Sequence, residues 1–226
     1  MIVSTLLTKT FPELQLVRPD NNIEPEYKNK ESVLRSRMWK GKSTRIAKAR
    51  LCLLDIPGKF FAETLVIYPK LYYDYPIFGC EYLNIGGKKF FGAVDFHPIS
   101  KTTNYADRFL SDLPDTSKES SKFYNLKEYF SNKFWIKTQP TPFYYDEYLG
   151  VIDKYLNAYS TCLQSDDCTL PQRACSQTHS NYLAQCNYNT HMAENDPARG
   201  ILKAYFSEEF AEHYIDNFLF TLNWPW

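Results

Sequence analysis

The chain has 226 residues, of which 44% are hydrophobic and 17% are aromatic, and its formal net charge is zero. This length predicts one domain over residues 1–226, with enough apolar surface for a core and for a large pocket. The zero net charge argues against nucleic acid or an anionic membrane as a partner. No apolar run approaches the roughly 18 residues that a membrane span needs.

The N-terminal stretch MIVSTLLTKTFPELQL begins with apolar residues, but it has no basic region before them and no small-residue cleavage site. We therefore expect no signal peptide. This predicts a cytosol-like compartment: the cytoplasm of a bacterium or of a virus-infected host, or a plastid stroma after loss of a transit peptide. Residues 1–30 become polar and rich in Pro and Asn after Leu16, so we expect a short N-terminal segment and then a loop.

The region from Val33 to Arg50 is basic and contains no acidic residue. Alternation around residues 38–40 and 45–54 predicts two strands joined by a turn at Gly41–Ser43. The basic side chains allow two interpretations: a solvated edge that discourages aggregation of strands, or a docking face for an acidic partner. The docking face would consist of Arg35, Arg37, Lys40, Lys42 and Arg45.

Three further strands are predicted at residues 60–68, 78–85 and 88–96, where β-branched and aromatic residues are concentrated. Pro57-Gly58 indicates a turn before the first of them, and Gly86-Gly87 indicates a tight hairpin between the last two. The connections are short, apart from an aromatic loop at Tyr72–Pro76. This pattern favours an antiparallel meander over alternating strands and helices.

Helical spacing predicts helices at residues 104–113, 124–132 and 144–163, and a helix around 176–192 after a polar loop at 166–173. A last helix opens at Asn195-Asp196-Pro197, where an acid precedes a proline at the first helical position. Strands first and helices afterwards predict an α+β layered sandwich. The apolar stripe of the last helix consists of Leu202, Phe206, Phe210, Tyr214 and Phe218.

Two carboxylates are candidates for proton chemistry. In a strand, Asp95 shares a face with Phe91 and Ala93, and burial there would raise its pKa as a proton donor requires. The alternative is a strand-end carboxylate that caps the turn at His97, a residue that could also share a proton with Asp95. Asp196 is suited to capping the last helix, but one oxygen can cap while the other faces a ligand. We hypothesise that both acids face one pocket and give protons to a bound ligand.

Other chemistries have no positive support in the sequence. It contains no HExxH, no GxSxG and no Cys/His spacing for a metal, and Gly86-Gly87 lacks the rest of a phosphate-binding loop. We therefore expect no bound metal, and we expect the three remaining histidines to be solvated or structural: His179, His191 and His213. The cysteines match no zinc or iron–sulfur site, so we expect free thiols, with a disulfide within residues 162–186 as the alternative. They are Cys52, Cys80, Cys162, Cys168, Cys175 and Cys186.

Four segments together resemble the ferredoxin-dependent bilin reductases, over roughly residues 33–222: YPKLYYDYPIFGCEYL, GAVDFHPI, EYFSNKFWIK and NDPARGILKAYFSEEFAEHYIDNFLF. The resemblance implies a three-layer α/β/α sandwich with a central antiparallel sheet flanked by helices. It implies that biliverdin or a dihydrobiliverdin binds between the sheet and the C-terminal helices. It also implies no bound cofactor, because electrons come singly from reduced [2Fe-2S] ferredoxin and protons come from acidic side chains through bilin radicals.

The resemblance also assigns site residues. The proton-donating aspartates of the family fall on Asp95 and Asp196, and the basic residue that faces the substrate propionates falls on Lys137. Arg199 is a second candidate for holding a carboxylate, from its position in the DPARG turn. The remaining expected substrate contacts are Thr64, His97 and Phe206.

One departure bears on the product. Phycocyanobilin-forming members have a histidine where this chain has Thr64 and an acid where it has Cys52, so their route to the A-ring vinyl group is doubtful here. The phycoerythrobilin branch has asparagine at the Thr64 position. The resemblance therefore favours that branch, with reduction of biliverdin IXα at the C15–C16 bridge to 15,16-dihydrobiliverdin and a second reduction to phycoerythrobilin left open.

Three other functions remain open from the sequence. They are a bilin carrier without catalysis, a reductase of phycocyanobilin or phytochromobilin type, and nucleic-acid binding through the basic strands. Acidic ferredoxin would dock on the basic face, or on Lys203 and the last helix, and the complex would weaken as salt rises. We expect a monomer that exchanges pigment with a heme oxygenase or a next bilin reductase.

Overall fold

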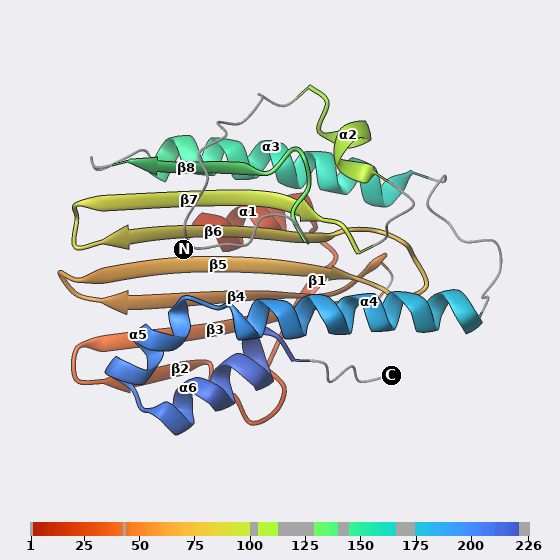
Figure 1. Ribbon diagram of the computed structural model, residues 1–226. Coiled ribbons are helices and arrows are strands. Elements are labelled where there is room, and N and C mark those ends of the chain that lie inside the picture. The colour runs from red at the N-terminus through yellow and green to blue at the C-terminus, as the bar shows by residue number, and fades with distance from the viewer. Residues whose placement is uncertain are drawn as a thin grey trace.

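An antiparallel sheet of eight strands forms the centre of the computed structural model, which describes residues 2–42, 44–99, 104–112, 129–139, 145–165 and 175–221 (Figure 1). From β3 to β8, each strand pairs with the next one along the chain, which confirms the predicted meander. These strands are β3 Ser32–Gly41, β4 Ile46–Ile56, β5 Phe60–Pro69, β6 Ile77–Ile85, β7 Lys89–His97 and β8 Trp135–Gln139.

The hairpin between β6 and β7 forms where the glycine pair predicts it. Gly86 and Gly87 have φ angles of 60° and 66°, in the left-handed region where a residue without Cβ is favoured. The predicted turn at residues 41–43 includes Ser43, which lies outside the described residues, and Gly41 is the last residue of β3.

The prediction of a short segment and a loop for residues 1–30 is wrong. Residues Ile2–Thr10 form helix α1, because Val3, Leu7 and Phe11 recur at helical spacing and are buried in the core. Two short strands then pair with β3: β1 (Leu14–Val17) and β2 (Glu26–Asn29).

One face of the sheet is covered by α1 and by α3 (Tyr145–Gln164), with the short helix α2 (Tyr105–Phe109) beside them (Figure 1). The predicted helix at residues 144–163 is thus confirmed. It buries one tyrosine-rich stripe against the strands, and its ring contacts reach Phe78 and Phe96. The buried residues of α3 are Tyr148, Ile152, Tyr155, Leu156, Tyr159, Cys162 and Leu163.

The opposite face is covered by helices from the C-terminal part of the chain. Helix α4 (Cys175–Glu194) crosses the sheet, and α5 (Ala198–Tyr205) and α6 (Glu208–Tyr214) follow it toward β2 and β3 (Figure 1). A π-helical turn at Ile215–Leu219 ends this layer. Helices therefore lie on both sides of the sheet, which confirms the α+β sandwich.

The last helix is not continuous, although its apolar stripe predicts one element. It breaks at Phe206, and Ser207 takes an extended conformation whose Oγ accepts a hydrogen bond from Phe210 N at 3.0 Å. This bond caps a new helix. The aromatic stripe survives the break, since Phe206, Phe210 and Tyr214 stack in series with centroid distances of 5.0 and 5.7 Å.

Two shorter helix predictions need correction. Helix α2 ends at Phe109 because Leu110 leaves the helical conformation, and residue 113 lies outside the described part. Residues 129–132 do not form the end of a helix, since Ser131 instead binds a carboxylate of the sheet. Residues 124–128 and the predicted loop at 166–173 lie outside the described residues.

Several expected absences can be examined only in the described part of the chain. Four cysteines there are free thiols: Cys52, Cys80, Cys162 and Cys186. Cys168 and the side chain of Cys175 lie outside it. No described helix has the length and apolar character to cross a bilayer. The described residues also contain no cluster of three or more His, Cys, Asp or Glu suited to a metal ion.

Candidate active site

A cavity of about 210 Å³ lies between the sheet and the helical layer made by α4, α5 and the π-helical turn. Its walls are mostly apolar, and they carry three carboxyl groups: Glu81, Asp95 and Asp196. Apolar walls with a few placed polar groups are typical of sites for small ligands and cofactors. The two acids predicted to share a pocket therefore line the same one.

The strand register explains which side chains reach the cavity. Asp95 pairs with Gly79, Gly79 with Val66, and Val66 with Arg50, so these four residues form one row across β7, β6, β5 and β4. The next row on the same face is Ala93, Glu81, Thr64 and Cys52. Because side chains alternate along a strand, both rows point toward the helices that cover the cavity.

Asp95 has no exposed surface, and both of its oxygens accept hydrogen bonds from one residue. Ser131 Oγ donates to Oδ1 at 2.5 Å, and Ser131 N donates to Oδ2 at 2.8 Å. Burial raises the pKa of Asp95 to about 7, although these hydrogen bonds lower it. The carboxyl group can therefore hold a proton near neutral pH, and it also anchors the segment before β8.

His97 lies beside Asp95 but does not form a short hydrogen bond with it. Its Nδ1 is 3.6 Å from Asp95 Oδ2 and 3.0 Å from the carbonyl oxygen of Tyr129. Burial lowers the pKa of His97 to about 4, so the ring is neutral at pH 7. A carbonyl only accepts, so Nδ1 carries the proton and donates it to Tyr129.

Asp196 lies one residue before the position that the sequence predicts, because α5 begins at Ala198 and its N-cap residue is Pro197. The Oδ1 atom of Asp196 accepts a hydrogen bond from Ala198 N at 2.8 Å, and the half-buried side chain lines the cavity. Burial raises the pKa of Asp196 to about 6, against the lowering effects of the Ala198 bond and Arg199. Like Asp95, it is an acid with an elevated pKa at the edge of an apolar space.

Glu81 is a cavity residue that the sequence reasoning missed. It is partly exposed and accepts a hydrogen bond from Thr64 Oγ1 at 3.4 Å. A signal was present, because Glu81 is the one charged residue in β6 and alternates with the buried Cys80 and Tyr82. Cys52 lines the same wall, and burial raises its pKa to about 12, so its thiol stays protonated.

Three predicted substrate contacts lie outside the cavity lining. Lys137 pairs with Gly92, on the opposite sheet face from Asp95, and its Nζ is 2.8 Å from Glu147 of α3. Phe206 stacks on Phe210 rather than facing the cavity. In these positions, neither Lys137 nor Phe206 can contact a pigment bound in the cavity.

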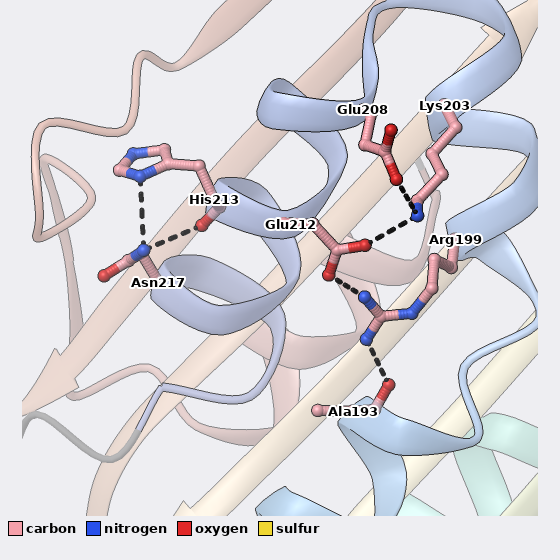
Figure 2. Close-up of polar contacts among 7 residues, drawn as sticks. All are labelled: Ala193, Arg199, Lys203, Glu208, Glu212, His213 and Asn217. Atoms are coloured by element: carbon pink, nitrogen blue, oxygen red, sulfur yellow. Dashed lines mark hydrogen bonds and ion pairs between the residues drawn. The ribbon is translucent and has the colours of Figure 1, made fainter.

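Arg199 also lies outside the cavity, in a charge network between α5 and α6 (Figure 2). Its guanidinium contacts Glu212 and donates to Ala193 O at 2.7 Å. Lys203 of the same helix lies 2.8 Å from Glu208 and 2.9 Å from Glu212. The carboxylate that Arg199 contacts therefore belongs to the chain, and its predicted contact with a substrate carboxylate stays a prediction.

Two other residues were missed. His191 of α4 lines the cavity, where the sequence predicted a solvated or structural histidine, and its ring lies 4.8 Å from that of Tyr129. Arg50 is buried at the other end, where it donates to Leu219 O at 2.8 Å and Thr221 O at 3.3 Å. Within the described residues, Arg50 is the one Lys or Arg that lines the cavity, and it fixes the C-terminal wall.

The predicted basic docking face is divided in the structure. Arg35 and Arg37 alternate with the cavity-side residues of β3, so they lie on the opposite face from Lys40. Arg35 is 2.8 Å from Glu26, and Lys40 is 3.2 Å from Asp20. The remaining member, Arg45, points inward and binds Tyr75 and the carbonyl of Ser165.

An antiparallel sheet lies between two helical layers, and three acids line one mostly apolar cavity, an arrangement suited to an organic ligand that takes up protons. The chain matches the family of ferredoxin-dependent bilin reductases over residues 8–221. It belongs to this family, as its sequence motifs predict, and it is a ferredoxin-dependent bilin oxidoreductase by class.

Named relatives cover most of the chain. It is 29% identical over 211 residues to a 15,16-dihydrobiliverdin:ferredoxin oxidoreductase of Prochlorococcus marinus strain MIT 9515, which covers 88% of this chain and 86% of the relative. An enzyme of the same name from strain MIT 9211 is 26% identical over 239 residues, covering 96% and 93%. One from Nostoc punctiforme is 26% identical over 192 residues, covering 81% and 78%.

A solved structure supports the fold. The crystal structure of phytochromobilin synthase from tomato in complex with biliverdin superposes with a TM-score of 0.79 at 20% identity. The match covers 98% of this chain and 82% of the tomato chain. It confirms the arrangement of a large antiparallel sheet with flanking helices.

Proposed function

We propose that the protein reduces biliverdin IXα at the C15–C16 bridge to 15,16-dihydrobiliverdin. Two reduced ferredoxin molecules each give one electron, and two protons complete the saturation of C15 and C16. The relatives named above as 15,16-dihydrobiliverdin:ferredoxin oxidoreductases support this regiochemistry. Cys52 and Thr64 in the cavity wall support it as well, because they stand where the route to the A-ring vinyl group would need an acid and a histidine.

The observation that carries the proposal is the placing of three carboxyl groups in one apolar cavity. Burial raises the pKa of Asp95 to about 7 and that of Asp196 to about 6. A general acid works best when its pKa lies near the working pH, because it is then protonated and still transfers its proton readily. Of the two, Asp196 is the one that is partly exposed, so an electron added to a bound pigment would meet a matched proton donor at the head of α5.

The two donors come from opposite walls. Asp196 serves from the head of α5, and we assign to it the D-ring end of the pigment. On the sheet wall, the sequence predicts Asp95 as donor, but Asp95 has no exposed surface and Ser131 occupies both oxygens. Glu81 is partly exposed to the same cavity and needs no movement of that segment. We therefore assign the sheet-side transfer to Glu81 and a positioning role to Asp95.

We place the ferredoxin contact on the exposed side of β3 and the turn after it. Arg37 and Lys42 form no ion pair with any described residue, whereas Arg35 and Lys40 are paired and Arg45 points inward. Reversing both charges (Arg37→Glu with Lys42→Glu) should weaken the rate at low salt and remove most of its salt dependence. If the salt dependence of the rate is unchanged in this variant, ferredoxin docks on another surface.

An anaerobic assay with biliverdin and reduced ferredoxin tests the function itself. The expected result is a bound-pigment spectrum that changes with time, and a product that co-elutes with 15,16-dihydrobiliverdin in chromatography. A carrier without catalysis would instead give a bound spectrum that stays constant. Products reduced at the A-ring would contradict the proposed regiochemistry while leaving the family assignment intact.

A further inference from the structure

The imidazole of His97 is in contact with three other residues, and its Nε2 atom faces the cavity. Its ring contacts Phe130 and Tyr188, with centroid distances of 5.0 and 5.2 Å. Nδ1 donates its proton to the carbonyl oxygen of Tyr129 at 3.0 Å. With Nδ1 protonated and the ring neutral, Nε2 carries a lone pair and is a hydrogen-bond acceptor.

The absence of a side chain at Gly79 places Nε2 in the cavity wall. A Cβ built on Gly79 would lie 2.3 Å from His97 Nε2 and 2.9 Å from Cδ2, far inside van der Waals contact. Gly79 pairs with Asp95 across β6 and β7 and lines the cavity. The edge of the imidazole that bears Nε2 therefore lies directly over the cavity face of β6, in the space that any other residue at 79 would fill.

No described residue forms a hydrogen bond with Nε2, and this atom is not among the fully buried polar atoms that lack a partner. Nε2 is therefore open to the cavity, where an acceptor without a protein partner is available to a hydrogen-bond donor on a ligand. A lone pair accepts hydrogen bonds from N–H and O–H groups and repels carboxylates. The donors that a bilin with ionised carboxylates offers are its ring N–H groups.

We infer that His97 Nε2 accepts a hydrogen bond from a ring N–H of the bound tetrapyrrole, and that Gly79 is the positioning residue that makes room for this contact. The inference rests on the proposed function, because it takes a bilin as the ligand. It orients the pigment with its N–H edge toward β6 and its carboxylates away from this wall. A mostly apolar site needs few such polar contacts to fix the orientation of a ligand.

Nitrogen NMR of the protein labelled with ¹⁵N-histidine tests the contact directly. The chain has four histidines, so the His97 signals can be assigned with one variant. The expected result is that biliverdin shifts the His97 Nε2 resonance and leaves the protonated Nδ1 unchanged. An Nε2 resonance that does not respond to bound biliverdin, or a free protein protonated at Nε2, would overturn the inference.

A modified pigment separates the N–H edge from the carboxylates. Biliverdin dimethyl ester keeps every ring N–H but has no free carboxylate, so it should produce the same Nε2 shift. If the shift is lost with the bound ester, the contact belongs to the carboxylates and the inference is wrong. The NMR result does not depend on turnover. If biliverdin shifts the Nε2 resonance but is not reduced in the ferredoxin assay, the proposed reductase activity is wrong and the proposed contact is still supported.

Two variants give a second measurement. His97→Phe keeps a ring but removes the acceptor, and we expect about a tenfold loss of biliverdin affinity, the size of one hydrogen bond. Gly79→Ala should give a similar loss and disturb the His97 signals, because the new Cβ displaces the imidazole. His179→Phe, on the exposed side of α4, is the matched control and should bind like the wild type. Wild-type affinity in a folded His97→Phe would contradict the inference; if that variant does not fold, the NMR experiment decides.

Discussion

The two faces of the central sheet are built from the same strands but are used in opposite ways. On the face toward α3, Phe96 packs against Tyr155 and Tyr159, and the space is filled by rings. On the other face, the neighbouring residue Asp95 lines a cavity whose sheet wall contains small side chains such as Ala93 and Thr64. Alternation along one strand thus supplies a rigid core on one side and an open site on the other.

The helical layers differ in the same sense. Helix α3 runs without a break for 20 residues over the packed face. Over the cavity, α4 is equally long, but the chain then continues in α5, which has 8 residues, and the layer ends in a π-helical turn after α6. Short elements with their own caps can place single groups such as Asp196 at a cavity edge. The comparison suggests that one layer provides stability and the other provides the site.

The largest expected effect is on turnover, and it distinguishes the acids that donate protons from the other acid of the cavity. Glu81→Gln and Asp196→Asn should each lower turnover by about 10²–10⁴-fold, the usual contribution of a general acid, while biliverdin still binds. Single-turnover absorbance with reduced ferredoxin measures this. Glu209→Gln and Asp216→Asn, both exposed on the last helices, are matched controls that should leave turnover unchanged. Normal turnover in Glu81→Gln together with loss in Asp95→Asn would return the sheet-side transfer to Asp95.

A matched pair of phenylalanines compares the stability of the two faces. Phe96→Ala on the packed face should cost about 3–5 kcal/mol of unfolding free energy, because it leaves a cavity among rings. Phe91→Ala should cost less, since Phe91 already borders open space. Denaturant unfolding of both variants measures the difference. Equal losses would show that the cavity face contributes as much packing as the other.

The pH dependence of stability reports on Asp95. A carboxyl group whose pKa is higher in the folded chain binds more protons when folded, so stability is full below the ordinary pKa and falls as pH rises. For Asp95 the fall should extend from its ordinary value of 3.8 to about 7. Asp95→Asn should flatten this slope in denaturant titrations at pH 5 and pH 7.5, leaving the part due to Asp196. If the unfolding free energy of Asp95→Asn depends on pH as steeply as that of the wild type, groups other than Asp95 cause the pH dependence.

The smallest expected effect concerns the break between α5 and α6. Ser207→Ala removes the bond that Oγ accepts from Phe210 N and should cost about 0.5–2 kcal/mol of unfolding free energy. Thermal unfolding measures the change. Because the break belongs to the layer over the cavity, biliverdin affinity should also fall in this variant. A stability loss without any change in affinity would show that the cap does not shape the cavity.

Local patterns predicted most of the fold. Alternation located the strands around residues 38–40 and 45–54, and β-branched and aromatic residues located the three strands between residues 60 and 96. The stripe of Tyr148, Ile152 and Tyr155 located α3. The same patterns gave the wrong answer where the apolar signal was short, as for the N-terminal helix with Val3 and Leu7. They also missed the extended conformation of Ser207, which a local side-chain hydrogen bond stabilises against the helix.

The site was predicted in part, because its details depend on register and on distant contacts. Ile136 pairs with Ala93 on the cavity face, so the next residue, Lys137, must point to the other face, and sequence spacing does not reveal this choice. The hold of Ser131 on Asp95 joins residues 36 positions apart. By contrast, Tyr188, His191 and Asn195 lie at helical spacing along one wall, and this pattern could have indicated His191.

The central claim is that one apolar cavity brings a bilin between an acid of the sheet and an acid of α5. A crystal structure of the biliverdin complex tests it most directly. We predict that the pigment lies in the cavity, with the carboxyl groups of Glu81 and Asp196 within about 2.6–3.2 Å of its polar atoms or one water away. A pigment bound outside the cavity, or with both carboxyl groups turned away from it, would contradict the account.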